Sequence, residues 1–368
     1  MRGQQHSAWP SSLQELLLRA ALLHGDEART AWNHWAAMVE LDTIDWGSKR
    51  LLAATYANLV DLEIEHPFMH DMKEYKQKTW LETQLLFHQT EPAIRALEDA
   101  GIPTMLTKGA ALVLRHYRDY GLRPMADFDV VVPTEQAGDA MATLEANGFQ
   151  LMPEHAQLDD LKRLHAATFV TDIGRQLDLH WHVIGGCPDD GPFWNNAVPV
   201  VLGDTNTMTL SPTELLLHVC VHGVRANPVP PIRWVVDSAV IIRGGEVNWD
   251  RLVRASRKFR FSHRMRAALV YLDRFDVGVP ALTIERLSKG DRVGLERREF
   301  ERITRSRSKS VGTQLAAAWL GFERFVSTER GLRRIVYLPE YLRSMWGIGS
   351  TWKLPFVAAK KVTRRLVD

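Results

Sequence analysis

The sequence is poor in cysteine, with Cys187 and Cys220 as the two examples among 368 residues. Their spacing matches neither a CxxC pattern nor a zinc-binding pattern, which excludes a disulfide scaffold and favours a reducing compartment. Long apolar runs are also missing, because uncharged segments such as Gly191 to Gly203 are too short and too rich in Pro and Asn to cross a membrane. The N-terminal residues lack the apolar core of a signal peptide. We therefore expect a cytoplasmic protein.

The first 300 residues have a net negative charge, and the excess of positive charge lies after them. The whole chain has a net charge of +2, yet residues 301–368 contain 14 basic and 5 acidic side chains. A protein that wraps nucleic acid is usually basic across its folded face, so we do not expect a nucleic acid partner. The basic tail, which also carries Trp346, Trp352 and Phe356, has three open interpretations: a helix packed on the body, a helix on an anionic membrane surface, or a contact with an acidic protein partner.

Two common catalytic motifs do not occur in the chain. There is no GxSxG segment and no GxxxxGK[ST] segment, which excludes the nucleophile elbow of α/β-hydrolases and the P-loop of many NTPases. What the chain does have is the composition of a globular protein of two or three domains, with 45% hydrophobic and 24% charged residues.

The pattern of apolar residues predicts an α/β (α+β) fold, in which a small mixed sheet lies between helical segments. Apolar positions spaced by three and four residues predict several helices before residue 100, divided at Pro67 and Pro92. After this point the predicted strands are 102–107, 127–132 and 175–183, and the predicted helices are 110–117, 134–147 and a series from 211 to about 290. The predicted regions are a helical N-terminal region (1–100), an α/β core (101–200), a helical domain (201–300) and a basic tail (301–368).

Asp127 and Asp129 occupy alternate positions of the second predicted strand. Because side chains alternate along a strand, both carboxylates lie on one face, about 7 Å apart, while Phe128 and Val130 point to the other face. Paired carboxylates suit Mg²⁺, which binds through oxygen and usually also contacts substrate phosphates. An isolated pair of this kind is more often the solvated face of an edge strand.

Two further features accompany this pair. Lys108-Gly109 ends the first predicted strand, where a glycine before a helix lets the backbone approach a phosphate and Lys108 adds a full charge. In the third strand, Asp178 shares a face with His180 and His182; a third carboxylate there completes a two-metal site and orients or deprotonates an attacking hydroxyl. Each feature alone is an ordinary turn or amphipathic strand, but their order along the chain is much more specific.

Five segments of the chain together resemble a known family. They are LTKGAAL (106–112), RPMADFDVVV (123–132), LDLHW (177–181), LLHVCVHG (216–223) and RWVVD (233–237). Over roughly residues 10–290 the sequence resembles the uncharacterised nucleotidyltransferase family of the polymerase-β-like superfamily. Lys108-Gly109-Ala110 stands where the wider superfamily has a Gly-Gly or Gly-Ser pair.

The resemblance implies transfer of a nucleotidyl or phosphoryl group from an NTP, such as ATP, to a hydroxyl of a small-molecule or peptide acceptor. Asp127, Asp129 and Asp178 would be the catalytic carboxylates and the ligands of Mg²⁺. The implied fold is the small mixed-sheet nucleotidyltransferase core.

The same resemblance implies substrate-binding roles for four residues. Lys108 and Gly109 would meet the triphosphate, and His180 would line the active cleft. Arg123 would either reach a phosphate from the loop before Asp127 or form a structural ion pair.

Two other functions remain open at this point: a kinase-like transfer of the γ-phosphoryl group, and a catalytically inactive binding or regulatory protein. Three clustered carboxylates argue against the inactive protein, because like charges without a metal destabilise a fold. His218 and His222 have the spacing of two zinc ligands, but Val219 replaces the glutamate of the HExxH motif. We therefore expect them to be histidines of the core or of the site wall.

Overall fold

The computed structural model describes residues 8–152, 165–171, 174, 176–227, 231–290, 292–304, 311–327 and 335–357. Within these ranges the chain forms one mixed sheet and a large number of helices, so the predicted α/β class is confirmed. No helix among these residues is both long and apolar enough to span a membrane.

Residues 12–99 are mainly helical, as predicted. The helices are α1 (Ser12–Leu22), α2 (Gly25–Ala36), α3 (Trp46–Lys49), α4 (Leu52–Asp61) and α5 (Phe68–Asp99). The expected break at Pro92 is wrong, because this proline lies inside the 32-residue helix α5. An internal proline costs about 3 kcal/mol, but the turn after it buries Ala93, Ile94 and Leu97 completely, and this packing holds the helix together.

Seven strands form the sheet in the order β3-β4-β5-β2-β1-β7-β6. They are β1 (Met105–Leu106), β2 (Asp127–Val131), β3 (Gln150–Leu151), β4 (Ala166–Val170), β5 (Gln176–His180), β6 (Val198–Leu202) and β7 (Thr205–Thr209). The three predicted strands are present as β1, β2 and β5, with β1 reduced to two residues. Because β7 pairs with β1, the sheet extends past residue 200, where the predicted core ended.

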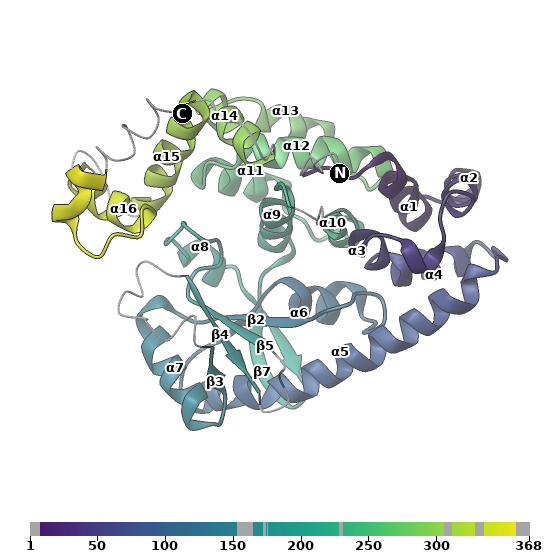
Figure 1. The fold of residues 1–368 in the computed structure, drawn as a ribbon, viewed down its shortest axis with the longest axis horizontal. Coiled ribbons are helices and arrows are strands. Elements are labelled where there is room, and N and C mark those ends of the chain that lie inside the picture. The colour runs from purple at the N-terminus through teal and green to yellow at the C-terminus, as the bar shows by residue number, and fades with distance from the viewer. Residues whose placement is uncertain are drawn as a thin grey trace.

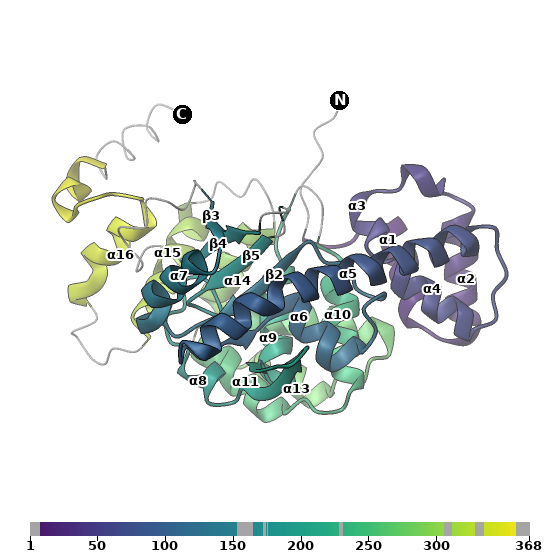
Figure 2. The same ribbon diagram turned by 90° about the horizontal axis from the view of Figure 1, so that it is seen from below.

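One face of the sheet is apolar and covered by helices. Phe128 and Val130 of β2 and Leu177 and Leu179 of β5 are fully buried in a core with α5 and with α7 (Ala137–Ala146). Figures 1 and 2 show α5 running along this face of the sheet and continuing beyond it to the N-terminal helices. The polar side chains of Asp127, Asp129, Asp178 and His180, at the alternate positions of β2 and β5, therefore lie on the opposite face.

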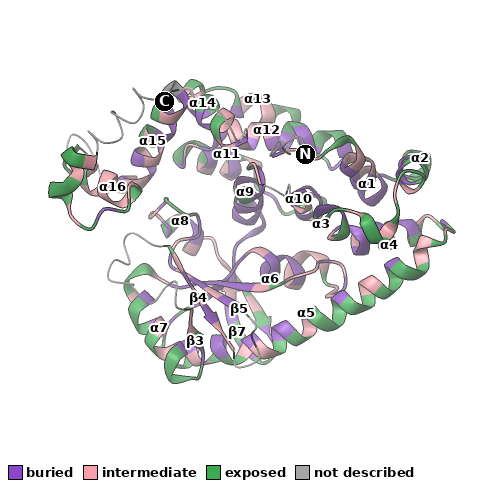
Figure 3. Cartoon of the chain, in the orientation of Figure 1, coloured by how far each residue is buried: buried purple, intermediate pink, exposed green. Residues whose placement is uncertain are grey.

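The opposite face lies toward a layer of helices from the second half of the chain. Two short elements follow β1, namely α6 (Lys108–Leu112) and a π-helical turn (Val113–Tyr117). The first helices of the second half of the chain are α8 (Gly191–Trp194), α9 (Pro212–Gly223), α10 (Arg233–Arg243), α11 (Trp249–Lys258), α12 (Ser262–Leu272) and α13 (Ala281–Leu287). Helix α9 connects the sheet to this layer and is buried on nearly every side (Figures 1 and 3).

The N-terminal helices share a core with the C-terminal helices. Buried residues of α1 and α2 belong to the same apolar cluster as those of α9 to α12. Arg243 of α10 also donates a 2.6 Å hydrogen bond to the carbonyl of Leu22 at the end of α1. Two segments far apart in the sequence thus form one helical layer, while α5 belongs mainly to the sheet.

Part of the predicted basic tail packs on this layer. The described elements are α14 (Val293–Thr304), α15 (Val311–Phe325) and α16 (Leu338–Met345). Arg324 of α15 is buried, forms two 2.6 Å contacts with the carboxylate of Glu299, and lies 4.2 Å from the ring centre of Phe261. Residues 358–368 lie outside the described ranges. The membrane and partner interpretations of the tail remain predictions.

Candidate active site

The register of the sheet brings the carboxylates of two strands side by side. β2 and β5 run parallel, and Asp129 is directly opposite Asp178. On the far side of β5, Thr168 of β4 is opposite Asp178 and donates a 2.7 Å hydrogen bond to its Oδ1. One ligand atom each from Asp129, Asp178 and His180 lies within 4.8 Å of the other two. The structure therefore clusters two of the three predicted carboxylates with the predicted histidine.

Asp129 is the most firmly held of these groups. Its side chain is only 3% exposed, and its Oδ1 contacts both the Nζ of Lys108 and, at 2.9 Å, the Nε2 of His180. Burial by itself raises the pKa of Asp129, but the hydrogen bond with His180 and the charge of Lys108 outweigh burial and hold that pKa well below its usual range. Asp129 is therefore ionised at neutral pH.

Asp127 has a different environment on the same strand face. It is half-buried, and it forms no hydrogen bond or ion pair with any residue that the structure describes. Burial and the neighbouring charge of Asp129 raise the pKa of Asp127. An unpaired carboxylate beside two others is a donor set suited to a hard divalent cation, which prefers oxygen ligands. The residues present thus fit Mg²⁺.

Lys108 and Gly109 lie where α6 begins, next to the carboxylates. Lys108 has a left-handed backbone with φ of 46°, which is unusual for a residue with a side chain and is maintained here by its contact with Asp129. A Cβ on Gly109 would lie 2.5 Å from Nη1 of Arg123 and 2.7 Å from Cε of Met125. Gly109 therefore lets the loop before β2 close over the start of α6.

Arg123 forms the ion pair that the sequence analysis kept as one of two alternatives. Its Nε and Nη2 donate to the two carboxylate oxygens of Asp237 at 2.9 and 3.1 Å, and both side chains are almost fully buried. Tyr117 donates a further 2.8 Å hydrogen bond to Asp237. This pair fastens the loop of Arg123 to α10. A phosphate contact by Arg123, which also lines the cavity, remains a prediction.

A cavity of about 270 Å³ lies against Asp127, Asp129, Lys108 and Gly109. Its other walls carry three arginines, Arg50, Arg225 and Arg233, and two tryptophans, Trp46 and Trp234. Neither Arg50 nor Arg225 has a side-chain hydrogen bond or an ion pair in the described part of the chain, although Arg50 lies 5.4 Å from the ring centre of Trp46. The cavity thus combines carboxylates with guanidinium groups that have no anionic partner.

The two histidines of α9 also line this cavity. His218 and His222 have ring centres 5.9 Å apart. Burial and the charge of Lys108 lower the pKa of His218 to about 3, so this side chain is neutral at physiological pH. Their position favours the site-wall interpretation. His182, in contrast, does not share the face of Asp178 and His180, because β5 ends at His180; its Nδ1 lies 2.7 Å from Asp190.

Most basic residues of the cavity were not predictable from the sequence. Arg50 and Trp46 lie far before the carboxylates in the sequence, in a helical region without a local motif, so no signal indicated them. Arg225 follows α9 in a loop, and no sequence motif indicated it either. Arg233 belongs to the RWVVD segment that carried the resemblance, and its presence there was the one available signal.

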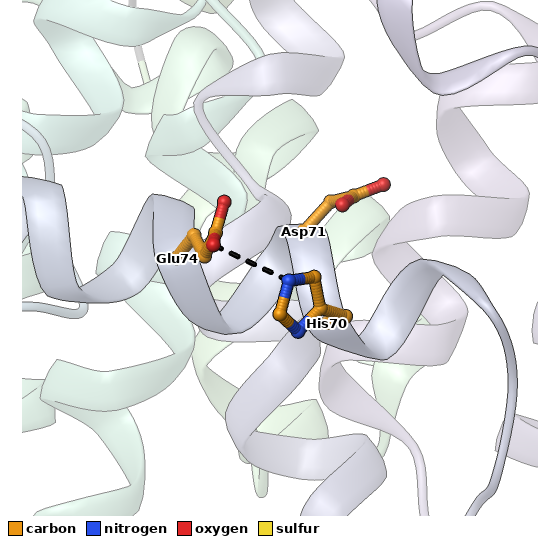
Figure 4. A group of neighbouring side chains, drawn as sticks. All are labelled: His70, Asp71 and Glu74. Atoms are coloured by element: carbon orange, nitrogen blue, oxygen red, sulfur yellow. Dashed lines mark ion pairs between the residues drawn. The ribbon is translucent and has the colours of Figure 1, made fainter.

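A second group of possible metal ligands lies on the surface of α5. His70, Asp71 and Glu74 are exposed, and the Nε2 of His70 is 3.3 Å from a carboxylate oxygen of Glu74 (Figure 4). This contact has the i,i+4 spacing of ordinary helix-surface pairs. We assign no function to this group.

The comparison with known protein families finds a match. Residues 47–275 match the family described as uncharacterised nucleotidyltransferase. The chain belongs to this family. The resemblance inferred from the five sequence segments is thereby confirmed, and the protein is a transferase by family. No curated protein matches the sequence.

Several solved structures are similar to the chain at low identity. The antibiotic-resistance factor ANT(2'')-Ia is 15% identical, with 60% of this chain and 95% of that chain covered and a TM-score of 0.34. An antigenic nucleotidyltransferase-like protein from Paracoccidioides brasiliensis is 15% identical, with coverages of 55% and 92% and a TM-score of 0.38. The lincosamide antibiotic adenylyltransferase LnuA is 15% identical, with coverages of 34% and 79% and a TM-score of 0.24. Scores this low carry no statement about the substrate of this chain.

Proposed function

We propose that the protein transfers a nucleotidyl group from an NTP, with ATP as the first candidate, to a hydroxyl of a small-molecule or peptide acceptor, and that the reaction depends on Mg²⁺. The observation that carries the proposal is the 270 Å³ cavity, in which Asp127 and Asp129 lie opposite arginines without anionic partners. Carboxylates alone suit a cation and arginines alone suit an anion. A metal-bound triphosphate satisfies both.

In this proposal Asp127, Asp129 and Asp178 hold Mg²⁺. When bound, the cation would offset the charge of the triphosphate and stabilise the charge that develops during transfer. The ion pair of Lys108 with Asp129 and the hydrogen bond from Thr168 to Asp178 fix the carboxylates before substrate arrives. Preorganisation of this kind lowers the cost of reaching the reactive geometry.

The phosphates are assigned to the basic wall of the same cavity. Arg50 has a guanidinium group free to donate. Arg233, whose Nε lies 4.0 Å from a carboxylate oxygen of Asp237, donates to the carbonyl of Pro124 at 2.5 Å with further donors remaining. The base is assigned to Trp46, a residue that is 54% exposed and lines the cavity. Stacking of a base on an aromatic ring is sequence-tolerant and contributes about 1–3 kcal/mol.

The transfer itself forms a bond from the acceptor hydroxyl oxygen to the α-phosphorus. The bond between that phosphorus and the oxygen bridging to the β-phosphate breaks, and pyrophosphate leaves. We assign the hydroxyl proton to the carboxylate of Asp178, one oxygen of which is held by Thr168.

The test is thermal unfolding with ATP, GTP, CTP and UTP in turn, with and without Mg²⁺, on the wild type and on Asp127→Asn. A ligand at a hundredfold excess over its Kd stabilises a native state by about 2.7 kcal/mol. We expect a shift that needs both nucleotide and metal and is lost in the variant. No shift with any nucleotide would reject the proposal and favour an inactive binding protein.

A labelling experiment separates nucleotidyl from phosphoryl transfer. ATP carrying ³²P at the α- or at the γ-position is incubated with the protein, Mg²⁺ and a pool of hydroxyl compounds. Label from the α-position in a new product supports nucleotidyl transfer, and label from the γ-position would show a kinase-like reaction instead.

We also propose a cytoplasmic location. Cys187 and Cys220 are both free and buried, as suits a reducing compartment. Cell fractionation tests this location, and recovery with the membrane fraction would contradict it.

A further inference from the structure

A second cavity adjoins the proposed nucleotide site. Its volume is about 530 Å³, and it shares Lys108, His218, His222 and Arg225 with the first cavity. The remaining wall includes His165, Arg264 and Arg324, together with the exposed pair Gly185 and Gly186. A volume in this range is typical of sites for small organic molecules. Because His180, which touches Asp129, also lines this cavity, a ligand here lies beside the catalytic carboxylates.

The lining of this second cavity is one-sided in charge. Among its described lining residues there is no aspartate and no glutamate, whereas one lysine and three arginines contribute to it. Two of these four cations are already neutralised, Lys108 by Asp129 and Arg324 by Glu299. The other two, Arg225 and Arg264, form no ion pair in the described structure.

Arg264 contacts a carbonyl and an aromatic ring, and it forms no ion pair with a carboxylate in the described structure. Its Nη1 donates to the carbonyl of Val221 at 2.8 Å, and its guanidinium lies 5.3 Å from the ring centre of Phe261. A carbonyl and an aromatic ring hold the side chain in place without neutralising its charge. Burial of an uncompensated guanidinium is costly, so an anion that enters the cavity gains from it. Arg225, two residues after the end of α9, has no side-chain hydrogen bond in the described structure and offers further guanidinium donors.

The histidines of the cavity respond to the same positive surroundings. Burial, followed by the charges of His180 and His182, lowers the pKa of His165 to about 4. At neutral pH His165 and His218 are therefore uncharged and able to exchange hydrogen bonds with a polar ligand.

We propose that this second cavity binds the acceptor, and that the acceptor is a small hydroxyl compound carrying an anionic group, a phosphate or a carboxylate. This inference rests on the proposed nucleotidyl transfer, since it places the acceptor hydroxyl beside Asp129 and His180. Arg225 and Arg264 bind the anionic group. A cationic acceptor is disfavoured, because it finds no carboxylate in the described wall and meets two unpaired guanidinium groups.

The experiment uses the full-length protein with Mg²⁺ and a saturating non-hydrolysable ATP analogue, α,β-methylene ATP. Four matched probes are then titrated and followed by thermal shift: glycerol 3-phosphate, glycerate, glycerol, and the cationic aminodiol serinol. We expect at least one anion to bind at least tenfold more tightly than glycerol, with serinol the weakest. The two anions distinguish a phosphate from a carboxylate as the recognised group.

Two variants and one control test the location. Arg264→Gln removes an unpaired cation from the cavity, and His165→Glu places a carboxylate in its wall. Arg254→Gln removes a cation from an exposed position of α11 that lines neither cavity. We expect both cavity variants to weaken anion binding at least tenfold and the control to leave it unchanged. The melting temperature without ligand shows whether each variant is folded, and His165→Glu keeps the test valid if Arg264→Gln is not.

The outcomes separate the two proposals. If the ATP analogue does not stabilise the wild type, the proposed function fails, while anion binding is still measured without nucleotide. If the analogue binds but no anion binds more tightly than glycerol, or the cavity variants leave anion binding unchanged, the anionic acceptor is rejected. Loss of analogue binding in folded Arg264→Gln would reassign the second cavity to the nucleotide and also overturn the inference.

Discussion

Lys108 and Asp129 form an ion pair that joins the start of α6 to the middle of β2 across 21 positions of sequence. Asp127, two residues earlier on the same face, has no such partner in the described structure. The pKa of Asp129 is consequently lowered, whereas that of Asp127 is raised. Two aspartates that are alike in the sequence therefore have opposite effects on stability.

The first prediction concerns these two aspartates in the absence of divalent metal. A raised pKa means that ionisation of Asp127 costs stability as the pH rises above about 4, so Asp127→Asn is expected to be as stable as the wild type or slightly more stable at pH 7. A lowered pKa means that Asp129 contributes stability at pH 7 that is lost as the pH falls below about 4. Asp129→Asn, which leaves Lys108 without its partner, is expected to lose about 3 kcal/mol.

Urea unfolding in EDTA at pH 7 and at pH 4 measures both effects. Equal destabilisation of the two variants at pH 7 would contradict the assigned environments. Because Asp127→Asn is expected to keep the stability of the wild type, it is the better variant for activity measurements.

A second prediction concerns the base platform. Trp46→Ala is expected to weaken binding of MgATP by about 5- to 100-fold, which corresponds to the loss of one stacking contact. Trp80→Ala is the matched control, because Trp80 is 47% exposed on α5 and lines neither cavity. Quenching of tryptophan fluorescence by nucleotide should be smaller in the first variant, where Trp234 is the cavity tryptophan that remains, and unchanged in the second. Persistence in both would place the base elsewhere.

Arg50 supports a third prediction about the phosphates. Its guanidinium has no anionic partner in the described structure, so Arg50→Gln should cost little stability while losing a charge-assisted contact with phosphate. Such contacts contribute about 1.5–3 kcal/mol, so affinity for MgATP is expected to fall by about 10- to 100-fold. Isothermal titration calorimetry measures this affinity for MgATP. Unchanged affinity in a folded variant would remove Arg50 from the phosphate site.

The buried pair of Arg123 and Asp237 supports a fourth prediction. Asp237→Ala leaves the Arg123 guanidinium buried without a partner and is expected to destabilise the fold by about 3–5 kcal/mol. The double variant Arg123→Met with Asp237→Leu is expected to recover most of that loss, because it removes both charges. Urea unfolding of the single and double variants measures how much stability the double variant recovers. A double variant no more stable than the single one would show that Arg123 is not held chiefly by Asp237.

The helices and strands that carry the site were predictable because their signals are local. Alternation in β2 and β5 placed the carboxylates on one face and the apolar residues on the other, as the buried Phe128 and Leu177 confirm. The long helix α5 was not predictable, because the packing that keeps it continuous past Pro92 comes from a sheet formed later in the chain. The short strands β3, β6 and β7 had signals too weak to separate from loop.

What the sequence by itself determined is the chemistry of the carboxylate-bearing face of β2 and β5. Residue types and period-two spacing are sufficient for that, since the geometry of a strand is the same in any fold, and the family follows from the same segments. Only the tertiary structure decided what surrounds that face. The pairing of Asp129 with Asp178 depends on the register between two strands, and the basic walls join Arg50, Arg225 and Arg264 from helices and loops distant in sequence. These side chains come together only because the apolar faces of their helices and strands pack against one another. Their spacing along the chain therefore does not predict that they line one cavity.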